Sequence, residues 1–185
     1  MKYCEECGSP LIFRENGIDG MVPYCERCGA FRFPRYNVAM STLVMNETLD
    51  QVILIQQYGR TDNILVAGYV NLGEALEDGV RREVAEELGL HVIHCRYLRS
   101  KYFARSNTLM CNFLTVVDDV SLDHVNGEID RIAWFTPEEA RACIKPGSLA
   151  QEFLNLGLDD LEQGRLSEIF PEKRAAKNGE ENVPG

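Results

Sequence analysis

The sequence predicts an α/β fold, a three-layer α/β/α sandwich around a mixed sheet, preceded by a small N-terminal unit. Two observations support this prediction. Strand-like apolar segments lie on both sides of an amphipathic helix within residues 68–90, which is the interleaving expected of a sheet covered by helices. A chain of 185 residues is also long enough for one medium-sized domain and a short appendage.

The N-terminal unit is predicted from two cysteine pairs, Cys4-x2-Cys7 and Cys25-x2-Cys28, each followed by a glycine that permits a tight turn. Four thiolates from two such pairs make a closed tetrahedral Zn²⁺ site, so we expect a structural zinc ribbon over residues 1–34. The metal would hold a segment that is too short to build a core. The alternative interpretation is a pair of redox-active motifs.

Residues 35–162 are predicted to form the main domain, and the charged residues 163–185 a disordered tail. Apolar alternation and short apolar runs indicate strands, and a proline followed by helix-forming residues marks a helix start. The expected strands cover residues 38–44, 52–56, 91–98, 110–117 and 131–135, and two helices are expected from Pro137 onward and over 148–161.

Composition excludes several classes of protein. The net charge of −10 argues against broad, charge-driven binding to nucleic acid, although bound metal ions would reverse the local sign at a nucleotide site. Neither a membrane span nor a signal peptide is expected, because no apolar run of the necessary length occurs. Seven cysteines without a secretion signal indicate a reducing compartment, so we expect a cytoplasmic protein.

The helix within residues 68–90 is expected to carry the chemistry. Glu83, Glu86 and Glu87 share one of its faces, whereas the apolar residues that repeat at every fourth position lie on another. Carboxylates placed so closely repel one another unless a cation lies between them, and hard divalent cations such as Mg²⁺ or Mn²⁺ prefer these oxygen ligands. The alternative is a solvated acidic helix face. Gly89 is placed to end the helix.

The spacing Gly-x5-Glu-x7-Arg-Glu-hydrophobic-x-Glu-Glu-x-Gly-hydrophobic is met at every fixed position between Gly68 and Leu90. It resembles the Nudix box, the signature of hydrolases that cleave a nucleoside diphosphate linked to another group. The resemblance implies the same α/β/α sandwich and a metal-dependent hydrolase acting on phosphoric anhydrides. A cysteine ribbon directly before the box domain, followed by Phe33-Pro34-Arg35, resembles the NADH pyrophosphatase branch, whose bacterial members also remove NAD caps from RNA.

The resemblance also implies roles for the acidic residues. Glu83 and Glu87 should be metal ligands, Glu86 a ligand or a supporting carboxylate, and Glu87 our preferred general base. A further pair, Glu74 and Arg82, should hold the loop against the helix. The remaining metal ligands implied by the family are the carbonyl of Ala67 and the carboxylate of Glu128, for which an exposed loop glutamate is the alternative.

Substrate contacts are carried over in the same way. Phe33 and Tyr69 match aromatics that stack on the substrate, Phe33 doing so in the neighbouring subunit, and a homodimer is therefore expected. Core packing is the alternative for both aromatics. Independently of the resemblance, the basic residues Lys101 and Arg105 are candidates for contacting a phosphate, and solvated surface residues are the alternative. The other substrate-binding residues that the resemblance indicates are Thr108, Met110 and Ala150.

One segment departs from the branch. Where its members carry Ser-Gln-Pro-Trp-Pro-Phe-Pro-x-Ser, residues 100–110 contain none of the prolines, so the pocket loop should differ in shape and rigidity. The predicted function is metal-dependent cleavage of the diphosphate of NAD(H) or a related compound to mononucleotides. The alternatives are ADP-ribose, FAD or another diphosphate, or a non-catalytic nucleotide sensor. RNA decapping is not favoured by a ribbon with three basic and five acidic residues through Ala30.

Overall fold

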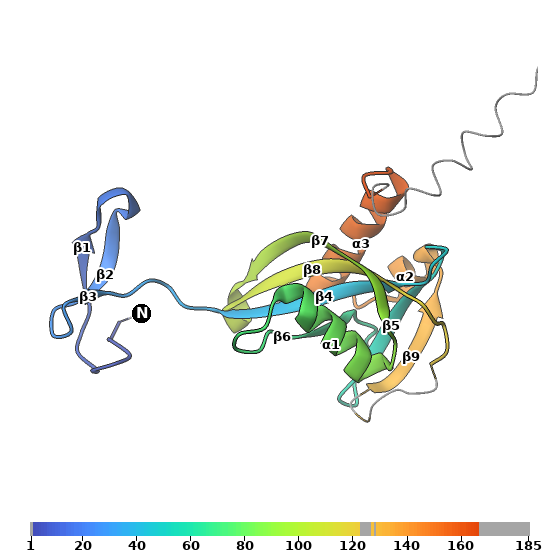
Figure 1. Ribbon diagram of the computed structural model, residues 1–185, viewed down its shortest axis with the longest axis horizontal. Helices are drawn as coiled ribbons and strands as arrows, with labels where there is room; N and C mark the ends of the chain where they lie inside the picture. Colours follow the sequence, from blue (N-terminus) through green and yellow to red (C-terminus); the bar gives the residue numbers. More distant parts are fainter. Residues whose placement is uncertain (1, 123–126, 128, 167–185) are drawn as a thin grey trace, which may run out of the picture. The chain divides into compact units, whose positions relative to one another are not determined.

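The computed structural model describes residues 2–122, 127 and 129–166 (Figure 1). The chain divides into two compact units, Met1–Tyr36 and Asn37–Gly185. Glu128 lies outside the described residues, as does most of the predicted tail. Among the helices of the described part, none is long and apolar enough to cross a membrane.

The first unit is a small antiparallel sheet in the order β1-β2-β3. Val22 is a buried apolar residue of this unit. Its interior is completed by the cysteines described below. The elements are β1 (Ile12–Glu15), a 3₁₀ turn η1 (Gly17–Asp19), β2 (Met21–Cys25) and β3 (Ala30–Phe31).

The second unit is built on a mixed sheet in the order β7-β8-β4-β5-β9, with β6 also paired to β4. The pairing of β4 with β8 is parallel, whereas the other strand pairs are antiparallel. The strands are β4 (Asn37–Met45), β5 (Val52–Gln57), β6 (Val66–Tyr69), β7 (Val92–Phe103), β8 (Thr108–Val117) and β9 (Ile129–Phe135), and the helices are α1 (Leu76–Leu88), η2 (Ala104–Ser106), α2 (Pro137–Cys143) and α3 (Leu149–Glu162).

Helices cover both faces of this sheet, which confirms the predicted three-layer sandwich. Alternate residues of β5 show the division, because Leu54 packs in the core with Phe153 of α3, whereas Ile53 packs in the core with Val84 of α1. The helix α1 ends at Gly89, whose φ of 68° is the left-handed conformation that glycine adopts at little cost. The sheet therefore presents α1 on one face as a rigid support for its acidic residues.

The segment that we expected to be a pocket loop, residues 100–110, is instead a β-hairpin. Strand β7 continues to Phe103, and Lys101, Tyr102 and Phe103 pair with Met110, Leu109 and Thr108 of β8. Prolines cannot donate a backbone hydrogen bond to such a ladder, so their absence permits the two strands to extend. The turn is closed by Asn107 in the left-handed conformation.

Candidate active site and candidate zinc site

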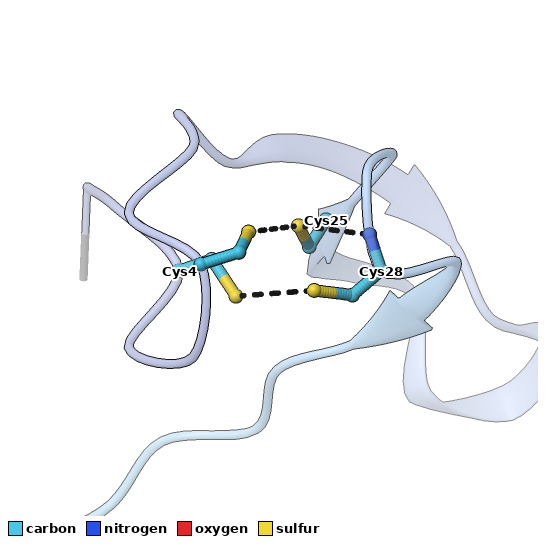
Figure 2. Close-up of side chains that lie close together, drawn as sticks. Cys4, Cys25 and Cys28 are labelled. Carbon is cyan, nitrogen blue, oxygen red and sulfur yellow. Dashed lines mark hydrogen bonds between the residues drawn. The ribbon is translucent and has the colours of Figure 1, made fainter.

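The four N-terminal cysteines converge in the first unit, and their sulfur atoms all lie within 4.8 Å of one another. Figure 2 shows Cys4, Cys25 and Cys28 of this cluster. The Sγ atoms of Cys4 and Cys28 are 4.0 Å apart, and those of Cys7 and Cys25 are 3.5 Å apart. A tetrahedral site with Zn–S bonds of about 2.3 Å has sulfurs separated by about 3.8 Å. The four sulfurs therefore fit a zinc ion, and none of them is in a disulfide.

The pKa values of two thiols in this cluster are shifted in opposite directions. Hydrogen bonds with Ser9 lower the pKa of Cys7 to about 6. A hydrogen bond with Cys7, together with burial, raises the pKa of Cys28 to about 12. Four thiols this close together cannot all ionise easily without a compensating positive charge. The cluster is therefore suited to a cation that binds thiolates.

The box helix places its acidic residues beside β6 in the second unit. Val80, Val84 and Leu88 are fully buried against the sheet, which fixes the rotation of α1 about its axis. Glu83 and Glu86 consequently lie on the side of the helix where the loop between β6 and α1 passes.

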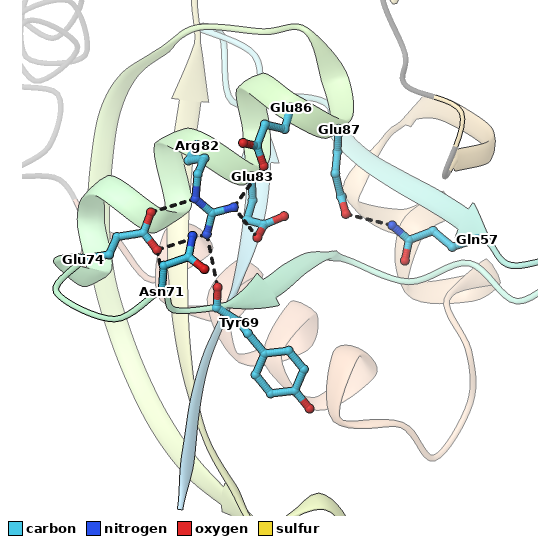
Figure 3. Close-up of polar contacts among 8 residues, drawn as sticks. All are labelled: Gln57, Tyr69, Asn71, Glu74, Arg82, Glu83, Glu86 and Glu87. Atoms are coloured by element: carbon cyan, nitrogen blue, oxygen red, sulfur yellow. Dashed lines mark hydrogen bonds and ion pairs between the residues drawn. The ribbon is translucent and has the colours of Figure 1, made fainter.

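Arg82 is the centre of a polar network that joins this loop to the helix (Figure 3). Its Nε and Nη2 atoms donate to the two carboxylate oxygens of Glu74 at 2.7 and 3.0 Å, and Nη2 also donates to the main-chain oxygen of Tyr69 at 3.1 Å. Its Nη1 atom donates to Glu83 at 2.8 Å and to Glu86 at 3.0 Å. One guanidinium thus meets three carboxylates, and the cluster keeps an excess of negative charge that suits a metal cation.

The bidentate contact with Arg82 lowers the pKa of Glu74 to about 2, assisted by a hydrogen bond from the main chain of Asn71. The same ion pair raises the pKa of Arg82. Both groups stay charged across the physiological range, so Glu74 and Arg82 act as a permanent clamp between the loop and the helix.

Gly68 provides space for Glu83. A Cβ atom added to Gly68 would lie 2.0 Å from the Oε1 atom of Glu83, so the carboxylate occupies the place where any other residue would carry its side chain. Glu83 is therefore held against the main chain of β6 beside Ala67, whose carbonyl was expected to be a ligand. The arrangement brings together a carboxylate and a strand that offers main-chain carbonyls, the oxygen donors that Mg²⁺ and Mn²⁺ accept.

Glu87 is separated from this cluster. It is only 5% exposed, and its Oε1 atom accepts a hydrogen bond of 2.9 Å from Nε2 of Gln57, at the end of β5. Figure 3 shows Glu87 turned toward Gln57 and away from Arg82. Arg82 therefore contacts Glu83 and Glu86, whereas Glu87 has Gln57 as a hydrogen-bond partner.

The expected substrate-binding residues fall into different environments. Tyr69 and Arg105 are exposed, Tyr69 by 58% of its surface. Lys101 contacts Glu152 of α3, with Nζ to oxygen distances of 2.5 and 2.7 Å, and both side chains are partly exposed. In the first unit, Phe33 is also exposed.

The remaining three expected contacts contribute to the interior of the second unit. Thr108 is buried and hydrogen-bonds to Ser106, and Met110 and Ala150 pack against the core on the α3 side of the sheet. These three residues therefore help to pack β8 and α3 in the second unit.

Sequence reasoning missed Gln57 and the steric role of Gly68. The visible signal for Gln57 was a pair of glutamines that ends an otherwise apolar strand, since a buried amide needs a polar partner. Gly68 was recognised as part of a spacing pattern, but the space that it leaves for Glu83 depends on how the helix packs on β6.

Comparison with protein families shows a match to the NUDIX domain over residues 35–153, more than half of the chain. Curated relatives are named NAD-capped RNA hydrolase NudC. One from Vibrio parahaemolyticus is 29% identical over 164 residues, which cover 87% of this chain and 61% of the relative. Another from Mycobacterium tuberculosis is 37% identical over 122 residues, which cover 64% of this chain and 39% of the relative. The chain thus spans about three fifths or less of the length of these relatives.

Solved structures agree on the fold. A NUDIX hydrolase from Nitrosomonas europaea aligns with a TM-score of 0.65 at 20% identity, covering 89% of this chain and 94% of that one. The NUDIX domain of Shewanella oneidensis NrtR, solved in complex with ADP ribose, aligns with a TM-score of 0.57 at 15% identity, covering 76% of this chain and 93% of that one. At these identities the likeness concerns the fold alone.

Proposed function

The chain belongs to the NUDIX family, and on that premise we propose that it is a metal-dependent hydrolase that cleaves the diphosphate of NAD(H) or a related compound to mononucleotides. The observation that carries the proposal is the cluster around Arg82, in which Glu74 holds the arginine and Glu83 lies against the main chain at Gly68. The names of the curated relatives support an NAD-type substrate.

In the proposed site, Glu83, Glu86 and the carbonyl of Ala67 would hold Mg²⁺ or Mn²⁺, with Glu87 and Glu128 as further proposed ligands. A bound divalent cation neutralises the charge of a diphosphate and lowers the pKa of a coordinated water. Arg82 orients Glu83 and Glu86 through its Nη1 atom and is itself held by Glu74.

Glu87 is the proposed general base, which accepts the proton of the attacking water. Its burial and its hydrogen bond with Gln57 hold the carboxylate in one orientation, and such orientation is what proton transfer requires. Figure 3 shows the Glu87 carboxylate apart from the carboxylates that Arg82 contacts.

The preference among diphosphates should depend on the hairpin of residues 100–110. Its ladder gives this side of the site a regular strand pair in place of a proline-stiffened loop. This observation favours a second candidate within the same chemistry, hydrolysis of ADP-ribose, FAD or another diphosphate. Tyr69 is an exposed aromatic that is available for stacking on a base.

The test is a panel of NADH, NAD⁺, ADP-ribose, FAD and NAD-capped RNA, each assayed with Mg²⁺ or Mn²⁺ and analysed for mononucleotide products. We expect cleavage of at least one dinucleotide and a loss of about 10²- to 10⁴-fold in kcat for Glu87→Gln. Glu77→Gln is the matched control, because Glu77 is an exposed glutamate of the same helix. Absence of turnover with every compound would refute the enzymatic proposal and favour a nucleotide sensor.

The proposal extends to the rest of the chain. Cys4, Cys7, Cys25 and Cys28 hold a structural Zn²⁺, supported by the separations of their sulfur atoms. A homodimer is proposed in which the exposed Phe33 serves the neighbouring subunit, and light scattering on the zinc-loaded protein tests its mass. A cytoplasmic location is also proposed, since seven cysteines that form no disulfide are typical of proteins in reducing compartments.

A further inference from the structure

A buried arginine lies directly against the cysteine cluster. Arg32 follows β3 and is only 8% exposed. Its Nε atom donates to the Sγ atom of Cys4 at 3.3 Å. A buried guanidinium needs nearby negative charge and an acceptor for each N–H group. The sulfur of Cys4 is one of these acceptors.

The other contacts of Arg32 hold it in this position. Its Nη2 atom is 2.6 Å from a carboxylate oxygen of Glu6, its Nη1 atom donates to the carbonyl of Phe31 at 3.2 Å, and its main-chain N–H donates to the carbonyl of Pro23 at 2.7 Å. The side chain of Glu6 is 62% exposed, so water screens its negative charge. Glu6 thus anchors the guanidinium, which leaves Nε–H of Arg32 directed at the sulfur of Cys4.

We propose that Arg32 is a positioning residue of the zinc site, where it orients the Cys4 thiolate and offsets part of the negative charge of the four-thiolate cluster. The inference rests on the proposed zinc site. Four thiolates around Zn²⁺ carry two net negative charges, and a hydrogen bond from a cation lowers the energy of the thiolate that accepts it. Arg32 should therefore slow the loss of zinc and protect Cys4 from electrophiles, which attack the thiolate form.

The protection should be unequal among the four ligands. Cys4 is buried and accepts from Arg32, whereas Cys28 is exposed. In the wild-type protein, Cys28 should react first with an alkylating agent, and Cys4 should react late. Removal of Arg32 should accelerate the reaction of Cys4 more than that of Cys28.

The experiment uses the full chain loaded with Zn²⁺ alone. Zinc transfer to a chelating dye gives the affinity, and mass spectrometry after timed alkylation gives the rate at each cysteine. We expect Arg32→Gln to lower zinc affinity by about 10- to 100-fold, as is typical when a group that orients a metal ligand is removed. Arg32→Lys keeps the charge but loses the directed Nε–H donor. Its zinc affinity should therefore lie between that of the wild type and that of Arg32→Gln.

Arg27→Gln is the matched control, because it removes the same charge from an exposed residue beside Cys28. Equal losses for Arg27→Gln and Arg32→Gln would overturn the proposal, since only the net charge would then matter. Unchanged affinity and unchanged alkylation of Cys4 in Arg32→Gln would also overturn it. If Arg32→Gln binds no zinc at all, the zinc affinity of Glu6→Gln becomes the test, because Glu6 holds Arg32 in place. A partial loss of zinc affinity in Glu6→Gln supports the proposal, and wild-type affinity refutes it. A wild-type chain that binds no zinc would instead refute the zinc site itself.

Discussion

Replacement of Gly68 by alanine should separate activity from stability. The new Cβ atom would lie 2.0 Å from Oε1 of Glu83, whereas ordinary van der Waals contact requires about 3.4 Å. The carboxylate must therefore move by about 1.4 Å. Glu83 can do so by rotating its flexible side chain, but it then loses its place against β6 and its 2.8 Å contact with Arg82.

The expected effect on catalysis is large and the effect on folding is small. A displacement of about 1 Å in a reacting group can lower the rate by about 10²-fold, so we expect kcat/KM of Gly68→Ala to fall by at least that factor. Since the φ angle of Gly68 is not in the left-handed region, alanine should not strain the backbone and should change the free energy of unfolding by only about 1 kcal/mol.

The assay measures kcat/KM with a cleaved dinucleotide and Tm for Gly68→Ala, Glu83→Gln and the double variant. If alanine acts by displacing Glu83, the double variant should be hardly worse than Glu83→Gln alone. Multiplicative losses in the double variant, or activity within threefold of wild type in Gly68→Ala, would refute the reasoning. A fall in Tm that parallels the fall in activity would point to unfolding instead.

Three further predictions follow from other contacts. Gln57→Leu removes the donor to Glu87 and should lower kcat by about tenfold with little change in KM, as steady-state kinetics can show, whereas Gln56→Leu, on the opposite face of β5, should not. Because the folded-state pKa of Glu74 is about 2, below its ordinary value of 4.5, its ion pair stabilises the protein fully above about pH 4.5 and is lost as the pH falls through 2. The stability difference between wild type and Glu74→Gln, measured by urea unfolding, should therefore shrink over this interval, and a constant difference would contradict the assignment. Removal of zinc by a chelator should increase hydrogen exchange in Met1–Tyr36 and leave the second unit protected, and protection that is unchanged in both units would argue against a structural metal.

Much of the fold could be predicted because it depends on residue patterns within short segments of the sequence. The period of apolar residues identified five strands of the main sheet and α1, but not the short β6; the glycine after Leu88 identified the helix end, and the paired cysteines identified the first unit. Residues 100–110 were misjudged because the expectation came from the prolines of relatives. Because this segment contains no proline, its backbone N–H groups can donate the hydrogen bonds of a continuous ladder, and the hairpin extends to Phe103.

The candidate site also has one part that local sequence patterns predicted and one part that they did not. Spacing on one helix determined that Glu83, Glu86 and Glu87 share a face, because that depends only on the helical period. It did not determine that Arg82 would engage the first two while Glu87 turns to Gln57, a residue 30 positions earlier in the chain. The ammonium group of Lys101 likewise donates to the carboxylate of Glu152, which lies 51 positions later in the chain.

The sequence by itself thus determined the class of fold, the cysteine set and the acidic box, all of which follow from periodicity and spacing along the chain. Only the tertiary structure decided the partners of the individual charges: Gly68 leaves room for Glu83, Gln57 holds Glu87 and Arg32 reaches Cys4. The physical reason is that hydrogen bonds and steric contacts act over a few ångströms. Which groups come within that range is set by the packing of strands and helices that are distant in the sequence.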